Sequence, residues 1–112
     1  MKRTPLKPVG KIGRANKRAD RKIAQIAMDH EIYYCEACEV LAELGHLGWQ
    51  CLQSHSNTHR HERDDYKHDL DKLWDFKQWI YACIPAHQFL DRNKEIREQV
   101  FIKLRGEDNL HS

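Results

Sequence analysis

The stretch Cys35-Glu36-Ala37-Cys38 decides how this chain can fold. Two cysteines separated by two residues form a tight turn that points both sulfurs at one metal ion, about 2.3 Å from each. The chain has 112 residues, of which 40% are hydrophobic and 32% charged. A chain of this size buries roughly 65% of its unfolded surface and benefits from an extra cross-link. We therefore expect one domain, stabilised by a metal ion bound to this cysteine pair.

Two further pairs can complete a tetrahedral zinc site with these two cysteines. Cys83 and His87 are four residues apart where a helix is expected to begin, so their side chains would share a helical face. Cys51 and His55 have the same spacing, and they follow Cys38 at a distance typical of small zinc fingers. We favour Cys83 and His87 because ligands far from the first pair close a larger loop. The set with Cys51 and His55 is the alternative.

The rest of the composition bears on the compartment. No apolar run approaches 18 residues, which excludes a transmembrane helix and a membrane partner. The N-terminal residues MKRTPLKPVGK are basic but lack the apolar segment of a secretory signal peptide. We therefore expect a cytoplasmic protein, in which four cysteines are metal ligands rather than disulfides.

The net charge of +2 conceals an uneven distribution. Residues 1–22 hold nine basic side chains and one acid, whereas acids outnumber bases by six in the rest of the chain. A basic arm on an acidic body favours contact with the phosphates of nucleic acid, and a solvated tail is the alternative. The candidate nucleic-acid-binding residues are Lys2, Arg3, Lys7, Lys11, Arg14, Lys17, Arg18, Arg21 and Lys22.

Hydrophobic periodicity predicts a mainly helical chain with at most a small β-hairpin. The expected organisation is a flexible basic arm at 1–14, a single domain at 15–106 and a tail at 107–112. Within the domain we expect helices at 15–34, 39–44, 69–82 and from Pro85 to Gly106, and a short strand at 49–52. Residues 53–65 are too polar for a core, so they are expected to form an exposed functional loop or a short helix.

Histidines concentrate in and just after this polar segment. Four of the eight lie between residues 55 and 68, namely His55, His59, His61 and His68. Neutral imidazole can bind a divalent metal or take a proton from water, and guanidinium groups such as Arg60 and Arg63 can clamp a phosphate. A base, a Lewis acid and a phosphate holder are what metal-assisted phosphodiester hydrolysis requires. A polar loop without chemistry is the alternative.

Four scattered motifs together carry a family resemblance. They are KRTPLK at 2–7, CEAC at 35–38, the Ser-His dipeptide at 54–55 and ACIPAHQFLDRN at 82–93. With these motifs, most of residues 2–95 resembles the small HNH endonucleases of bacteriophages. The resemblance implies a zinc-stapled ββα-metal domain with long flanking helices, which acts on DNA in the cytoplasm of a host cell.

The resemblance also implies roles for individual residues. Cys35, Cys38 and Cys83 match structural zinc ligands, His55 matches the general base, and His87 matches the histidine that closes a catalytic site for Mg²⁺ or another divalent ion. The chain departs from the family pattern in three places. Ala86 stands in place of the fourth zinc cysteine, Ser54 in place of a metal-binding histidine, and residues 69–82 hold no asparagine.

These departures leave two functional hypotheses. If His87 moves to the structural zinc, the loop residues His59, His61 or Asp64 would supply the missing ligands of the catalytic ion. The first hypothesis is a metal-dependent DNA endonuclease, with His55 as base and with Arg60 or Arg63 steadying the phosphate. The second is an inactive zinc-binding module that binds DNA, or that inhibits or adapts a host or phage protein acting on nucleic acid.

Overall fold

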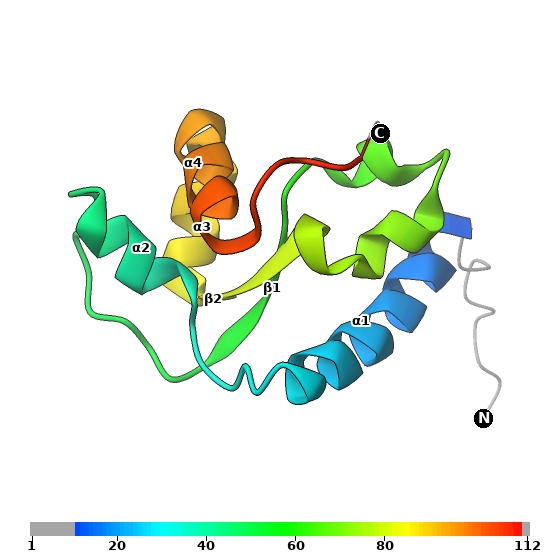
Figure 1. Cartoon of the computed structure of the whole chain (residues 1–112), viewed down its shortest axis with the longest axis horizontal. Coiled ribbons are helices and arrows are strands. Elements are labelled where there is room, and N and C mark those ends of the chain that lie inside the picture. Colours follow the sequence, from blue (N-terminus) through cyan, green and yellow to red (C-terminus); the bar gives the residue numbers. More distant parts are fainter. Residues whose placement is uncertain (1–10, 111–112) are drawn as a thin grey trace, which may run out of the picture.

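The computed structural model describes residues 11–110 and the side chains of residues 17–110 (Figure 1). Lys2, Arg3 and Lys7, together with the side chains of Lys11 and Arg14, lie outside the described residues. The elements in chain order are α1 (Lys11–Asp29), α2 (Ala37–Glu43), β1 (His55–His59), the 3-10 helices η1 (Arg63–Tyr66), η2 (Leu70–Trp74) and η3 (Phe76–Gln78), β2 (Trp79–Cys83), α3 (Ile84–Arg92) and α4 (Lys94–Arg105). The prediction of a mainly helical chain with a small hairpin is confirmed.

Helix α1 is amphipathic, as its sequence indicates, but it begins and ends earlier than expected. Ala19, Ile23 and Ala27 follow one another at intervals of four residues, and all three are buried. The helix ends at Asp29 rather than near residue 34, and Glu31 then adopts a left-handed backbone with φ of 57°. None of the described helices is long and apolar enough to cross a membrane.

Residues 69–82 do not form the helix that their sequence predicted. Two short 3-10 helices are separated by Asp75, which has an extended backbone and accepts a hydrogen bond from the Lys77 amide at 2.9 Å. The strand β2 follows, and four of its five residues are buried. A strand buried on both faces shows no alternation of polar and apolar residues, so its apolar run resembles that of a helix.

The hairpin pairs β1 with β2 in antiparallel register, from His55 opposite Cys83 to His59 opposite Trp79. β1 therefore lies within the polar stretch expected to be a loop, whereas the expected strand at 49–52 has no regular structure. Only Thr58 of β1 is buried, which explains why no hydrophobic signal marked it. Within the described residues β1 pairs with β2 alone, so its other edge is unpaired.

The predicted C-terminal helix is divided into α3 and α4 at Asn93. The backbone of this residue leaves the helical region, with φ of −129° and ψ of 77°. Its side-chain amide donates to the carbonyl of Phe89 at 2.8 Å and so satisfies a group at the end of α3. Helix α4 ends at Gly106, as predicted, where φ is 84°.

Two hydrophobic cores lie on the two faces of the hairpin. Ile80 and Ala82 pack with α2, α3 and α4 in the first core. Trp79 and Tyr81 point to the opposite face, where they pack with α1 and the η2 segment in the second core. The hairpin is thus held between α1 and the other three helices (Figure 1), and α3 contacts β1.

Candidate functional site

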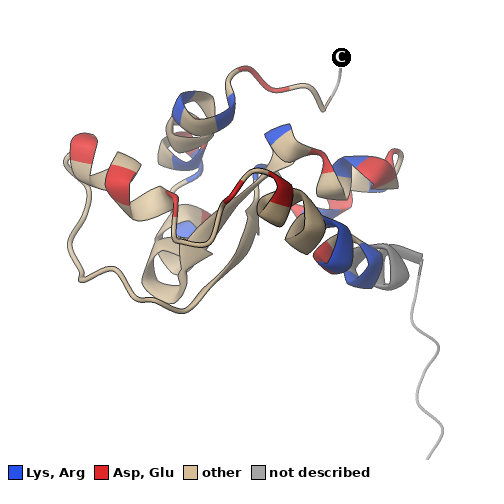
Figure 2. Ribbon diagram, turned by 60° about the horizontal axis from the view of Figure 1, so that its bottom comes forward, with Lys and Arg blue, Asp and Glu red and all other residues tan. Residues whose placement is uncertain are grey.

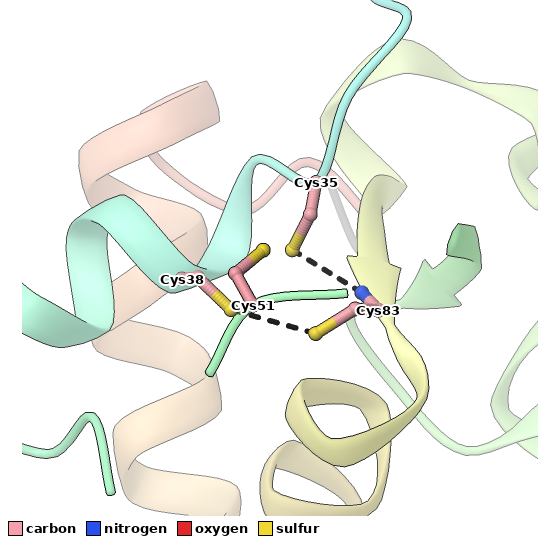
Figure 3. Close-up of side chains that lie close together, drawn as sticks. All are labelled: Cys35, Cys38, Cys51 and Cys83. Atoms are coloured by element: carbon pink, nitrogen blue, oxygen red, sulfur yellow. Dashed lines mark hydrogen bonds between the residues drawn. The ribbon is translucent and has the colours of Figure 1, made fainter. Parts of the chain in front are cut away.

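Four cysteines from distant parts of the chain meet at one end of the hairpin (Figure 3). Cys35 precedes α2, Cys38 lies in its first turn, Cys51 comes from the loop before β1, and Cys83 ends β2. Their sulfur atoms all lie within 4.8 Å of one another, and no two are joined as a disulfide. Four thiolates bound to one tetrahedral zinc ion would be about 3.8 Å apart. The cluster therefore has the composition and the spacing of a group that could hold a metal ion.

Hydrogen-bond donors point at the sulfur atoms of this cluster. The backbone amide of Cys83 donates to Sγ of Cys35 at 3.2 Å, and the indole of Trp49 donates to Sγ of Cys38 at 3.3 Å. Such donors stabilise a thiolate, which is the form that binds metal. The surrounding polypeptide thus supports the sulfurs as ligands.

The thiols respond differently to their surroundings. Burial raises the pKa of Cys38. Burial also acts to raise the pKa of Cys83, but hydrogen bonds from the backbone of Leu52 and Ala86 and from neighbouring thiols outweigh it and lower that pKa to about 7. One thiolate is therefore accessible near neutral pH, and a cation would be needed to hold all four ligands deprotonated.

The cluster differs from both of the predicted ligand sets. It joins three cysteines of the favoured set to Cys51 of the alternative set, and it contains neither His87 nor His55. Cys83 has an extended backbone and precedes the first turn of α3, so Cys83 and His87 do not share a helical face. Counting four cysteines in the chain would have given the observed set, whereas the i, i+4 spacing that we used did not.

A second concave site lies at the opposite end of β1. This cavity of about 280 Å³ is lined by side chains from α1, β1, η1, α3 and α4. The lining side chains that could bind a cation, a proton or a phosphate include Asp20, Asn57, His59, His61, Arg63, His87 and Asp91. Candidate bases, carboxylates and guanidinium groups from separate parts of the sequence therefore line one cavity that is open to solvent.

His59 is held in a defined tautomer within this cavity. Its Nε2 lies 2.7 Å from the carbonyl oxygen of Leu73, which only accepts, so Nε2 carries the proton. Burial lowers the pKa of His59, so the ring is neutral at pH 7 and Nδ1 keeps its lone pair. A neutral imidazole with one basic nitrogen can accept a proton from water or bind a cation.

His87 lies between a hydroxyl and a carboxylate. One ring nitrogen is hydrogen-bonded to the hydroxyl of Thr58 on β1, and Nε2 lies 3.1 Å from Oδ2 of Asp91, one turn further along α3. Both side chains of this pair are accessible to solvent, with exposed fractions of 36% and 53%. An imidazole nitrogen and a carboxylate oxygen are both groups that can bind a divalent cation.

The other candidate residues lie in unlike surroundings. Arg60 is 2% exposed, and its guanidinium binds the carboxylate of Glu98 and the carbonyl of Lys77, so it does not line the cavity as a phosphate holder would. Arg63 does line the cavity. His55 lies at the far end of β1, where its ring packs 4.7 Å from that of Tyr81. His59, rather than the predicted base His55, therefore occupies the cavity.

A basic helical surface borders the cavity. Lys17, Arg18, Arg21 and Lys22 are exposed on α1 (Figure 2). Among them lies Asp20, which accepts a hydrogen bond from the side chain of Asn57 at 3.2 Å and thereby fixes α1 against β1. Cationic side chains and the cavity are thus adjacent, which suits a polyanionic ligand.

Comparisons with protein-family models, with curated proteins and with solved structures found no match. Function must therefore be argued from the chemistry of the two sites. The cysteine cluster lies beside the pair His55–Cys83 of the hairpin, and the cavity lies beside the pair His59–Trp79.

Proposed function

We propose that the protein is a zinc-stabilised, divalent-metal-dependent nuclease of the HNH type that acts on DNA. The observation that carries this proposal is the cavity in which neutral His59, the His87–Asp91 pair and Arg63 face one another. His59 belongs to β1, Arg63 to η1, and His87 and Asp91 to α3, and the order β1, β2, α3 is that of a ββα-metal domain.

Zinc is the metal that best suits the cysteine cluster. Four thiolates form a closed tetrahedral site with no open position, which is typical of structural rather than catalytic zinc. The ligands come from the start of α2 and the residue before it, the loop before β1 and the end of β2, so a bound ion would join segments that are distant in the sequence. Its binding free energy would add directly to the stability of the fold.

The cavity residues suit hydrolysis of a phosphodiester. Nδ1 of His59 would take the proton from an attacking water, since Nε2 is committed to Leu73. A divalent cation held by His87 and Asp91 would supply Lewis acidity and would neutralise the charge that develops on the phosphate. Arg63 and the exposed cations of α1 would hold the flanking phosphates.

The test is nicking of supercoiled DNA in the presence of Mg²⁺ or Mn²⁺. His59→Ala should reduce the rate 10²- to 10⁴-fold, the usual effect of losing a general base. His55→Ala is the matched control, because it removes the same side chain from the same strand outside the cavity, and it should nick like the parent. Equal nicking by His59→Ala and the parent, or loss of nicking in His55→Ala alone, would refute the assignment.

One observation favours an inactive binding module as the second candidate. Both nitrogens of His87 are already engaged, by Thr58 and by Asp91, so a cation must displace one of these contacts. A parent protein that nicks no DNA with any divalent metal, yet binds DNA with an affinity that falls steeply between about 50 and 200 mM salt, would establish this alternative.

A further inference from the structure

A separate hollow lies beside the cysteine cluster, at the start of β1. It has a volume of about 430 Å³, and its walls are formed by Tyr33, Tyr34, Leu52 and Gln53 together with two of the cysteines. Tyr33 and Tyr34 are 64% and 57% exposed, and Leu52 is 44% exposed. Two neighbouring tyrosines and a leucine at such exposure need an explanation, since isolated large apolar side chains are common on surfaces but a concave group of them is not.

The segments before β1 and through β2 carry no charge, whereas the segment that supplies Tyr33 and Tyr34 to the hollow holds acidic residues at Asp29, Glu31 and Glu36. Residues 44–57 and 79–90 contain no Lys, Arg, Asp or Glu, although 32% of the chain is charged. Figure 2 shows this as tan ribbon along the loop before β1 and along the hairpin, in contrast to the blue of α1. The uncharged walls of the hollow suit the neutral, aromatic part of a ligand, and the exposed cations of α1 lie beside the cavity at the other end of β1.

We propose that the hollow binds an unpaired nucleobase of the strand whose phosphodiester enters the cavity, an inference that rests on the proposed nuclease function. Every base offers a flat, uncharged ring, and stacking on tyrosine recognises it without reading sequence. Within the described residues neither tyrosine ring stacks on another aromatic ring, so their faces are available. The side-chain amide of Gln53 adds a donor and an acceptor for the edge of a base.

The path between the two sites follows β1. From Gln53 to His59 there are six residues, which span about 20 Å in extended conformation. β1 joins the segment that lines the hollow to residues that line the cavity, so a nucleic-acid strand that runs along β1 would place its base in the first and its phosphate in the second. The base bound in the hollow is thus a few nucleotides from the reacting bond. Bases in a duplex are stacked and paired, so the hollow selects single-stranded or frayed DNA.

The test measures binding of a single-stranded oligonucleotide to the full zinc-loaded chain, without Mg²⁺ so that the strand stays intact. Tyr33→Ala and Tyr34→Ala should each weaken binding about 5- to 100-fold, the range for loss of one stacked base. Tyr33→Phe and Tyr34→Phe keep the ring and should bind like the parent. Met28→Ala is the control for loss of an exposed apolar side chain on α1, outside the hollow, and should change nothing.

A set of oligonucleotides with one abasic position makes the test specific. One abasic position should weaken binding to the parent by the same factor as Tyr34→Ala, and the two changes together should do no further harm. The salt dependence of binding should be unchanged in the tyrosine variants, because no phosphate contact is lost. Parental affinity in both alanine variants, with nicking still dependent on His59, would overturn this inference and leave the proposed function standing. A changed oligomeric state with unchanged DNA affinity would overturn it too, since the hollow would then be a protein interface.

Discussion

Replacing Cys51 by serine is the most informative single change, because Cys51 separates the observed cluster from the ligand set favoured by sequence. The side chain is exposed, so Cys51→Ser removes a sulfur without opening a cavity in the core. The buried Cys38 and Cys83 offer no such clean substitution, because their replacement also disturbs the packing of the first core. Any loss of stability in Cys51→Ser therefore reports on the metal.

The magnitude follows from linkage between metal binding and folding. If loss of one of four ligands weakens zinc binding 100-fold, stabilisation by the metal falls by about 2.7 kcal/mol when zinc is in excess. For a domain of this size 1 kcal/mol corresponds to about 4–8 °C in Tm, so the expected decrease is roughly 10–20 °C. Zinc content after purification without added metal should fall from one equivalent to well below one.

Calorimetry and metal analysis check this expectation against two controls. His87→Ala should keep its zinc, because His87 bonds to Thr58 and Asp91 and lies outside the cluster. In the presence of a strong chelator the parent and Cys51→Ser should melt at the same temperature, since both then lack metal. Full zinc retention by Cys51→Ser, or loss of zinc from His87→Ala, would refute the four-cysteine centre.

Two further predictions concern side chains that hold the fold. Arg105→Ala should lower the free energy of unfolding, measured in urea, by about 3–5 kcal/mol, because it leaves the buried carboxylate of Glu36 without its ion-pair partner. The control is Lys103→Ala, whose partner Glu43 is exposed and which should change the free energy of unfolding by less than about 0.5 kcal/mol. Equal effects of the two substitutions would contradict this reasoning. Burial acts to raise the pKa of Asp108, but hydrogen bonds from Gln78, the Leu110 amide and His61 outweigh it and lower the pKa to about 2. Asp108→Asn should therefore destabilise the protein by about 1 kcal/mol at pH 7, and the difference should shrink as the pH falls below about 4 and disappear below about 2. A difference independent of pH would show that the charge is not responsible.

The sequence predicted best those elements that bury only one of their faces. In α1 the apolar residues Ala19, Ile23 and Ala27 recur at helical spacing, so the helix could be recognised and only its ends were misplaced. β2 contacts both cores and β1 is almost entirely polar, so neither shows the alternation that marks a half-buried strand. The hairpin as a class was expected, but its position was not.

In the candidate sites, too, the features that depend on nearby residues could be predicted, and those that depend on tertiary packing could not. The Cys35–Cys38 pair was evident because its spacing is local. Spacing placed Cys83 in one set and Cys51 in the other, and that both lie beside the pair depends on how β1 and β2 pair. Arg60 and Arg63 are three residues apart with equal charge, yet one is buried against Glu98 and the other lines the cavity. Only the packing of α4 against the hairpin separates them.

Both hydrophobic cores contact the hairpin, so the molecule consists of two packed halves that the hairpin joins. His87 and Asp91 belong to the half that contains the cysteine cluster, whereas Asp20 belongs to the half built on α1. The cavity is therefore a seam whose opposite walls are fixed by different cores. Metal lost from the cysteines would loosen one wall before the other, so occupancy of the proposed zinc centre at one end of β1 would affect how the cavity residues at its other end are aligned.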